Sequence, residues 1–348
     1  MAMAGVTVRG AGVFGLSVAW ACARRGARVT VVDPAGVGAG ASGGVVGALA
    51  PHAPERWTEA KAFQFESLLM APDWWAEVQA TGGVDPGYAR SGRLQPVADE
   101  AALERARDRA EGAARHWGAH AVWEVIRAES AGPWAPVTPS GWLVRDTLSA
   151  RLHPRRACAA LAGAIRARGG RIEAEAPDAG HVVWATGAAG LAEIGGGFGR
   201  GVKGQAALLH FSAPEHPQIY ADGVHIVPHI DGTVAVGSTT ERDYDAPETT
   251  DAQLDAVLDR AVAVMPVLAG ARVAERWAGL RPRSRTRAPV LGPHPARPGQ
   301  FIANGGFKIG FGMAPLVGEV MADLLLEGRD RIPPGFRPEA CQAVALRP

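Results

Sequence analysis

The sequence predicts an α/β protein with two lobes, and three observations support this fold class. Residues 5–33 follow the order strand, glycine-rich turn, helix, strand, which is one βαβ unit. From residue 82 to residue 140 the pattern changes to short strands, a charged helix and several tryptophans, which indicates a second lobe. The chain returns to the first pattern near residue 181 and near its C-terminal end, so we expect both lobes to be discontinuous in sequence.

The first lobe is expected to begin with a strand at residues 6–8, an alanine-rich helix that Gly26 stops, and a strand at residues 29–32. Residues 34–47 are rich in Gly, Ala and Ser and are too flexible for a regular element unless something binds against their backbone. A helix over residues 60–79 follows. Later parts of this lobe are a helix over 154–168, strands over 171–174, 181–185 and 301–304, a glycine turn over 305–310 and a helix over 315–327.

The second lobe is expected to contain a strand over residues 91–97 and a helix over residues 100–117. Most of its sheet should come from strands over 205–211, 223–228 and 233–237, followed by a helix over 251–264. We therefore expect a Rossmann-like domain and a smaller mixed-sheet (α+β) domain. The first would comprise residues 1–80, 142–200 and 286–348, and the second residues 81–141 and 201–285.

Composition excludes several classes of protein. The 348 residues are 47% hydrophobic and 20% charged, close to the average of globular proteins, and no apolar run reaches the length of a membrane span. The 36 basic and 35 acidic residues are spread along the chain, so no patch for nucleic acid is expected. Neither a membrane nor a nucleic acid is an expected partner, and a homo-oligomer is left open.

The cysteines and the N-terminus favour a cytoplasmic protein. Cys22, Cys158 and Cys341 are odd in number and far apart, which suits buried thiols in a reducing compartment. The N-terminus leads straight into a strand without the basic and apolar segments of a signal peptide. No HExxH, paired CxxC or GxSxG motif is present, so neither a metal site nor acyl transfer is expected.

Three glycines form a dinucleotide-binding pattern between the first strand and the first helix. Gly10 makes the turn, Gly12 lets a pyrophosphate approach the backbone, and Gly15 lets the helix pack on the strand. The N-terminus of the helix supplies N–H groups and a partial positive charge. Asp33 ends the second strand, where its carboxylate can accept hydrogen bonds from ribose hydroxyls. The pattern predicts a dinucleotide site but does not separate FAD from NAD.

The segment after Asp33 favours FAD. Residues 40–51 are mostly Gly, Ala and Ser, where an ordinary NAD domain would continue with another helix. Small side chains there would let the backbone lie along an isoalloxazine ring. An NAD-dependent dehydrogenase is therefore the less favoured interpretation.

Further blocks along nearly the whole chain indicate a family resemblance. They occupy residues 41–42, 47–53, 182–188, 202–205, 225–228, 236–239, 277–282, 289–292 and 304–315, together with Gly232. With the motif at residues 10–33, they show that the sequence resembles the glycine oxidase, sarcosine oxidase and D-amino-acid oxidase family of flavoproteins, and most of all the glycine oxidases.

This resemblance implies an FAD-dependent oxidoreductase, with FAD extended in the first lobe and its ring against the second. It implies oxidation of the C–N bond of a small amino acid or secondary amine by hydride transfer to flavin N5, giving an imine. FAD should be non-covalent, because no cysteine lies where sarcosine oxidases attach flavin. The expected cofactor-binding residues are Gly10, Gly12, Val13, Phe14, Gly15, Asp33, Pro34, Ala41, Ser42, Gly47, Ala48, Leu49, Ala185, Thr186, Gly187, Gly306, Phe307, Lys308, Ile309 and Gly310.

Three residues are the expected catalytic-site residues by this resemblance. Arg281 matches the arginine of the Gly-Leu-Arg-Pro motif and should bind the substrate carboxylate through two parallel hydrogen bonds. Lys308 stands where sarcosine oxidases carry a lysine and glycine oxidases an arginine. His225 falls where glycine oxidases place a tyrosine, and a structural histidine is the alternative there.

The sequence departs from the family pattern in three places. Only residues 175–180 remain of a longer β-excursion that contacts adenine. Residues 283–288 read Arg-Ser-Arg-Thr-Arg-Ala and lack the usual aspartate, so the rim is more basic and could favour a substrate with a second negative charge. Gly306 replaces a histidine, and residues 233–237 lack the oxygen-activating lysine of sarcosine oxidases. Two alternatives therefore stay open: an amine dehydrogenase with an acceptor other than oxygen, and a flavin-binding subunit without its own catalysis.

Overall fold

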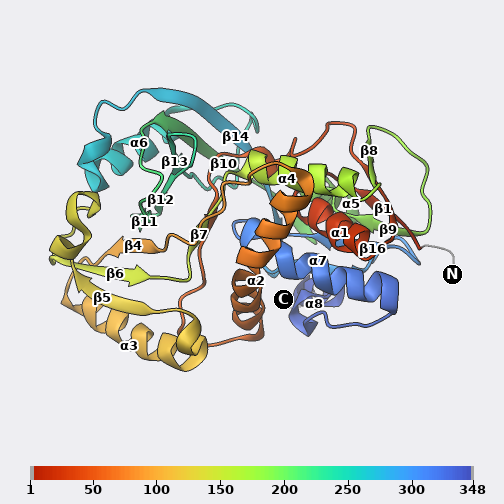
Figure 1. The fold of residues 1–348 in the computed structure, drawn as a ribbon, viewed down its shortest axis with the longest axis horizontal. Coiled ribbons are helices and arrows are strands. Elements are labelled where there is room, and N and C mark those ends of the chain that lie inside the picture. The colour runs from red at the N-terminus through yellow and green to blue at the C-terminus, as the bar shows by residue number, and fades with distance from the viewer. Residues whose placement is uncertain (1–3, 346–348) are drawn as a thin grey trace.

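The computed structural model describes residues 4–345 and contains two large sheets, each with its own helices (Figure 1). The first is a six-stranded sheet in the order β15-β16-β9-β1-β2-β8. All its neighbouring strands are parallel except β15 and β16. The strands are β1 (Gly5–Arg9), β2 (Arg28–Val32), β8 (Arg171–Glu173), β9 (His181–Trp184), β15 (Val290–Pro293) and β16 (Phe301–Asn304).

One face of this sheet carries the main hydrophobic core. Val6 and Val8 of β1 and Val29 and Val31 of β2 point into it, because alternate residues of a strand face the same side. Helices α1 (Val13–Arg24), α2 (Glu59–Gly82), α4 (Pro154–Ala167) and α7 (Gly310–Glu327) pack into this core, and residues 103–117 of a further helix extend it toward the second sheet. On the opposite face, the short loop after β8 contacts β1, where the Thr7 hydroxyl donates to the Ala179 carbonyl at 3.0 Å.

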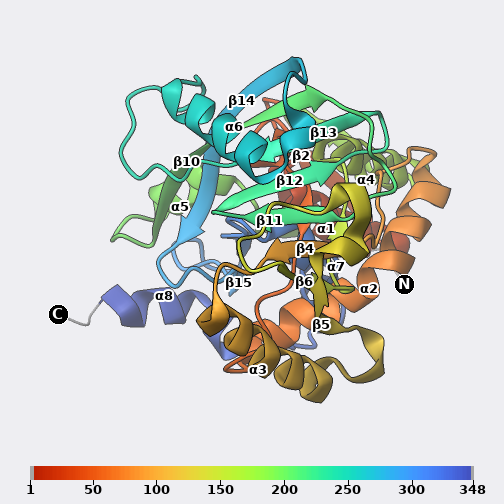
Figure 2. The same cartoon turned by 90° about the vertical axis from the view of Figure 1, so that its left-hand side faces the viewer.

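The second sheet has eight strands in the order β14-β10-β13-β12-β11-β4-β6-β5, and Figure 2 shows it from its outer side with α6 in front. Only β4 and β11 pair in parallel. The strands are β4 (Arg93–Pro96), β5 (Trp123–Arg127), β6 (Trp142–Asp146), β10 (Gly199–His210), β11 (Gln218–Ala221), β12 (Val224–Pro228), β13 (Thr233–Gly237) and β14 (Val273–Ser284). Helices α3 (Glu100–Trp117) and α6 (Ala252–Val264) belong to this lobe.

Strand β10 shows how alternation divides the second sheet into two faces. Ala207 and Leu209 join the core under α6. Ala206 and Leu208 join a small cluster with Val45, which comes from the segment that follows β2. The face opposite α6 therefore meets the first lobe along the small-residue segment.

The predicted fold class is confirmed, and several element bounds need correction. α3, β13 and β16 have the predicted bounds, whereas β5, β11 and the long strand β14 were not predicted. β6 belongs to the eight-stranded sheet, although the expected boundary at residue 142 places it in the Rossmann-like domain. α7 begins at Gly310 rather than at residue 315, so Gly310 is helical and Pro315 lies inside the helix. Proline lacks an N–H donor, which made a later start the simpler prediction.

The remaining elements are short. β3 (Ala48–Leu49) pairs with β7 (Ala150–Arg151), and α5 (Gly187–Ile194) follows β9. α8 (Pro338–Ala345) ends the described chain. Within residues 4–345, no helix combines the length and the apolar character that crossing a membrane requires.

Candidate active site

The three glycines of the first turn have different reasons to be glycine. Gly10 has a φ of +113°, and a Cβ there would lie 2.3 Å from the carbonyl oxygen of Ala185. A Cβ on Gly15 would lie 2.0 Å from the Gly10 carbonyl oxygen. A Cβ on Gly12 would meet only the Ser42 hydroxyl, at 3.2 Å. Packing thus requires Gly10 and Gly15, while Gly12 leaves the start of α1 open to a ligand.

The start of α1 meets the small-residue segment directly. A 3-10 turn over Ala41–Gly43 brings the Ser42 hydroxyl to the backbone N–H of Val13, from which it accepts a hydrogen bond at 2.9 Å. α1 has no acidic residue in its first turn and no side-chain cap at Gly12. This end of the helix therefore carries the partial positive charge that binds phosphate groups.

The glycine turn before α7 packs against the same helix start. A Cβ on Gly306 would lie 3.0 Å from the ring of Phe14, and one on Gly310 would lie 3.6 Å from Val13. The backbone N–H of Ile309 donates to the Gly306 carbonyl at 2.9 Å and closes the turn. The structure thus brings together the two glycine turns that the sequence assigned to one cofactor.

Asp33 stabilises the first glycine turn, which contains Gly10 and Gly12. Its carboxylate accepts hydrogen bonds from the backbone N–H groups of Ala11 at 2.8 Å and Ala35 at 3.0 Å. Each carboxylate oxygen has a second lone pair, so these contacts leave Asp33 able to accept from a ribose hydroxyl as well. Asp33 therefore shapes the turn besides standing beside the expected ribose position.

A cavity of about 280 Å³ opens at the carboxyl ends of the parallel strands. Open α/β sheets bind their ligands at this edge. The predicted residues Pro34 and Thr186 line the cavity, and so do two residues that were not predicted, Arg9 and Trp184. Arg9 also donates to Asp178 at 2.8 Å and so ties down the shortened loop. An arginine directly before Gly10 in an apolar strand was the signal that could have revealed it.

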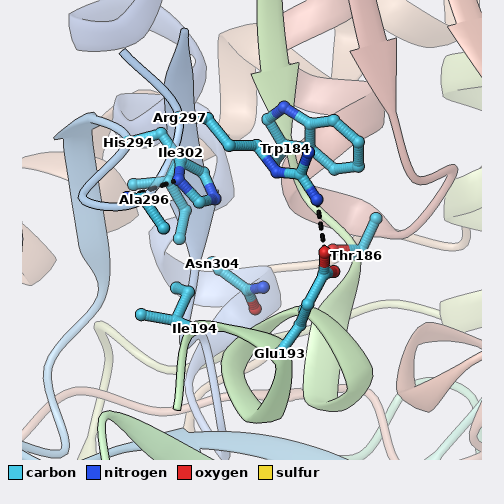
Figure 3. A pocket seen from close by; sticks show the side chains of 10 residues that line it. Trp184, Thr186, Glu193, Ile194, His294, Ala296, Arg297, Ile302 and Asn304 are labelled. Atoms are coloured by element: carbon cyan, nitrogen blue, oxygen red, sulfur yellow. Dashed lines mark hydrogen bonds and ion pairs between the residues drawn. The ribbon is translucent and has the colours of Figure 1, made fainter. Parts of the chain in front are cut away.

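Trp184 also lines a second cavity, of about 230 Å³, which Figure 3 shows from close by. Arg297 covers the Trp184 ring at 3.9 Å from its centre and forms an ion pair with Glu193. At the base of the second cavity, the side-chain amide of Asn304 donates to the Gly187 carbonyl at 3.0 Å. Thr186 lines both cavities, so the predicted segment 185–187 borders each of them.

Residues 47–49 are fixed in place by close packing against β7 and the residue after it. A Cβ on Gly47 would lie 1.7 Å from the Leu152 carbonyl oxygen, because this strand runs close to β7. Ala48 and Trp277 both pack against the small cluster between the lobes, and Leu49 is buried in the main core. The backbone at Ala48 is thereby fixed against the face of the second sheet.

Arg281 lies on that face of β14. Its guanidinium donates to the Ser238 hydroxyl at 2.8 Å and to the carbonyl oxygens of Thr239 at 2.6 Å and Lys203 at 3.2 Å. The Nε of Arg281 is buried and finds no partner within residues 4–345. Burial lowers the pKa of Arg281 to about 10, with Glu241 acting in the opposite direction, so the side chain stays cationic near neutral pH.

Lys308 lies near the same Phe307 ring as Arg281. The Arg281 guanidinium is 5.7 Å from the centre of that ring, and the Lys308 ammonium is 5.9 Å from it. The ammonium donates to the Thr240 hydroxyl at 2.8 Å. Burial and the nearby charge of Arg281 lower the pKa of Lys308. The two predicted cations therefore lie within each other's electrostatic reach.

His225 completes the predicted set. It lies on β12 opposite Gly237, and its ring centre is 4.6 Å from that of Tyr220 on β11. Its Nδ1 is buried without a partner in the described chain. Burial, helped by the charges of Arg93 and Lys308, lowers the pKa of His225 to about 3, so the imidazole is neutral. Tyr220 was not predicted, because a contact across two strands leaves no local signal.

Among residues 4–345, no cluster of three or more His, Cys, Asp or Glu side chains is placed to hold a metal ion. The residues do define a dinucleotide-binding α/β protein whose second sheet presents a half-buried arginine and a neutral histidine toward the first lobe.

The chain belongs to the DAO family of FAD-dependent oxidoreductases, because the model of that family, described as FAD dependent oxidoreductase, matches residues 5–324. It is 33% identical to the putative thiamine biosynthesis oxidoreductase ThiO of Rhizobium etli, over 92% of this chain and 97% of that protein. It is 26% identical to the glycine oxidase of Geobacillus kaustophilus, over 92% of each chain. The crystal structure of glycine oxidase from Geobacillus kaustophilus superposes with a TM-score of 0.82 and 23% identity, covering 96% of this chain and 98% of that one.

These matches confirm the predicted family, the fold class and the assignment as a glycine oxidase-like, FAD-dependent oxidoreductase.

Proposed function

We propose that this enzyme oxidises the C–N bond of a small amino acid or secondary amine to an imine. The observation that carries the proposal is the half-buried Arg281, whose buried Nε has no partner among the described residues. A guanidinium recognises a carboxylate through parallel hydrogen bonds, so this position suits the carboxylate of an amino acid. The similarity to proteins named glycine oxidase supports the amine part of the proposal.

The residues present fit FAD. Gly12 has no Cβ to block a pyrophosphate, α1 starts without a competing carboxylate, and the cavity at the strand ends has room for part of a dinucleotide. When bound, FAD supplies the two-electron acceptor for the oxidation. We propose that the Rossmann-like domain holds it and that the second domain binds the substrate.

We propose non-covalent FAD and a cytoplasmic location. Burial raises the pKa of the Cys22 and Cys158 thiols to about 12, and a protonated thiol is a poor nucleophile toward a flavin. All three cysteines are free and buried, which agrees with a reducing compartment.

In this proposal the chain's own residues bind and orient the substrate. Arg281 holds the carboxylate, and Lys308 adds a second positive charge beside the Phe307 ring. His225 stays neutral, so it does not compete with Arg281 for the carboxylate. Its imidazole can still donate or accept a hydrogen bond. Orientation alone contributes a large rate factor when the cofactor carries the difficult step.

Anaerobic mixing of the oxidised holoprotein with a panel of amines tests the proposal. We expect glycine, sarcosine, or an enantiomer of alanine or proline to bleach the visible absorbance of the flavin. Reduction by dithionite is the control that shows the flavin can be reduced. If dithionite bleaches the flavin and no amine does, the alternative of a non-catalytic flavin-binding subunit replaces the proposal. Slow recovery of colour in air would identify the dehydrogenase alternative.

The neutral state of His225 predicts a pH effect on stability. Between pH 6.5 and about pH 3 the unfolded chain binds a proton at this side chain that the folded chain does not bind. The folded state therefore loses stability as the pH falls through this window. We expect His225→Gln to lose fewer degrees of melting temperature between pH 7 and pH 5 than the parent, with a difference of a few degrees. The matched control is His210→Gln, which replaces an exposed histidine on β10. An equal loss in parent and variant would contradict the neutral assignment.

A further inference from the structure

Four arginines gather at the end of the second sheet next to Arg281. We call them the arginine rim: Arg200, Arg242, Arg283 and Arg287. Arg200 on β10 lies opposite Arg283 on β14, and Arg281 is two residues away on the same strand. Alternation places these three side chains on one face of the sheet. Glu241 forms a bridge with Lys203 on β10, and the backbone N–H of Arg287 donates to the Ser284 carbonyl at 3.2 Å, so Arg242 and Arg287 lie next to these strand ends. Burial and then the charges of Arg287, Arg242 and Arg200 lower the pKa of Arg283.

No rim arginine has a carboxylate partner or a side-chain hydrogen bond within the described chain. Other arginines of this protein do, for example Arg155 with Glu275 and Arg297 with Glu193. Exposed arginines elsewhere in the described chain, such as Arg166 and Arg171, also lack such a partner, so the rim is distinguished by four unpaired charges that lie together. Like charges held together raise the free energy of the folded state, and a bound anion relieves that repulsion.

The rim borders the candidate active site rather than a separate surface. The backbone N–H of Phe307 donates to the Pro282 carbonyl at 3.1 Å, which ties the loop that carries Lys308 to β14 between Arg281 and Arg283. Lys308 in turn binds Thr240, two residues before Arg242. Deeper in the site, Arg281 Nε and His225 Nδ1 are buried without partners in residues 4–345. The positive charge therefore continues from the half-buried Arg281 to the more exposed rim.

We propose that the arginine rim binds a second carboxylate of the substrate, so that the enzyme prefers amines with two acidic groups, the first of them held by Arg281. This inference rests on the proposed function. The two anion positions are separate: Arg281 lies within the site, while Arg242 and Arg287 are exposed. A monocarboxylate substrate leaves the rim without a ligand, whereas a dicarboxylate neutralises part of the repulsion.

Sarcosine and iminodiacetate form a matched pair of probes, because they differ in having a methyl group or a carboxymethyl group on the same nitrogen. We expect the parent holoprotein to favour iminodiacetate in kcat/KM by about tenfold or more, the size of one or two charge-assisted contacts. In Arg242→Gln/Arg283→Gln this preference should fall by about tenfold. Arg115→Gln, which removes an exposed positive charge on α3 beside the other edge strand of the sheet, should keep the parent preference.

The outcomes separate this inference from the proposed function. If sarcosine and iminodiacetate are turned over equally well, or if the double variant slows both by the same factor, the rim does not bind a second carboxylate and the inference is overturned. If no amine reduces the flavin, the proposed function fails instead. In that case the binding of succinate and propionate to the oxidised holoprotein, followed through the flavin spectrum, still decides the inference. Succinate should bind about tenfold more tightly in the parent and lose that advantage in the double variant, and equal binding would refute it.

Discussion

Arg281→Ala is expected to lower kcat/KM for a carboxylate substrate by about 100-fold, because the carboxylate loses a charge-assisted, bidentate partner in a buried site. The loss should fall mainly on substrate affinity, since Arg281 holds the part of the substrate that does not react. The guanidinium also donates to Ser238 and to two backbone carbonyls, so a moderate fall in melting temperature is expected as well. Steady-state kinetics on a substrate from the bleaching panel provide the measurement.

Arg281→Lys separates the contribution of the positive charge from that of the paired hydrogen bonds. Lysine keeps the positive charge but cannot form the parallel pair of hydrogen bonds, so we expect an intermediate loss of kcat/KM. An amine without a carboxylate should be oxidised at a similar rate by the parent and both variants. Unchanged kcat/KM for the carboxylate substrate in Arg281→Ala would remove Arg281 from the site and with it the main support for the proposed function.

Gly12→Val should abolish tight FAD binding, with a loss of affinity of at least about 100-fold, while leaving the apoprotein folded. A Cβ at this position meets only the Ser42 hydroxyl, so the turn itself has room for a side chain. The valine methyl groups would occupy the space through which a pyrophosphate reaches the backbone N–H groups of α1. Quenching of FAD fluorescence on titration with apoprotein measures the affinity, and circular dichroism reports the fold.

Two further glycine variants make this prediction specific. Gly335→Ala introduces a side chain where nothing lies within 4 Å and should keep the parent affinity for FAD. Gly15→Ala forces a Cβ to within 2.0 Å of the Gly10 carbonyl oxygen and should destabilise the apoprotein itself. Parent-like FAD affinity in Gly12→Val would show that the cofactor does not approach this turn.

Elements with a strong local pattern were predictable from the sequence. The βαβ unit around Gly10, the amphipathic helix α3 and strand β16 lie where periodicity, glycine stops and helix caps indicated them. β14 was missed although it has twelve residues, because Arg, Glu, Gly and Pro interrupt its apolar pattern. It is an edge strand with β10 as its partner, and a strand with pairing on one side tolerates such residues better than a central strand does.

The residues of the candidate site also fall into two groups, those that the sequence could indicate and those that only the structure reveals. The residues around Gly12 and Asp33 are close in sequence, and Arg281 and Lys308 match positions of a family motif, so the amino-acid sequence is enough to propose each of them. Other features of the site depend on strand register and on loops that meet in space. They are Tyr220 beside His225, the arginine pair Arg200 and Arg283, and Trp184 in the wall of two cavities.

Short-range patterns in the sequence thus predicted a dinucleotide-binding turn, most of the helices and the kind of chemistry to expect. Which side chains share one face of the second sheet was decided by the pairing of β10 with β14 and of β12 with β13, between segments far apart in the chain. A shift of one residue in either register would turn Arg281 or His225 to the face under α6. That register is selected by the burial of whole faces, which is a property of the assembled sheet and not of any short stretch of sequence.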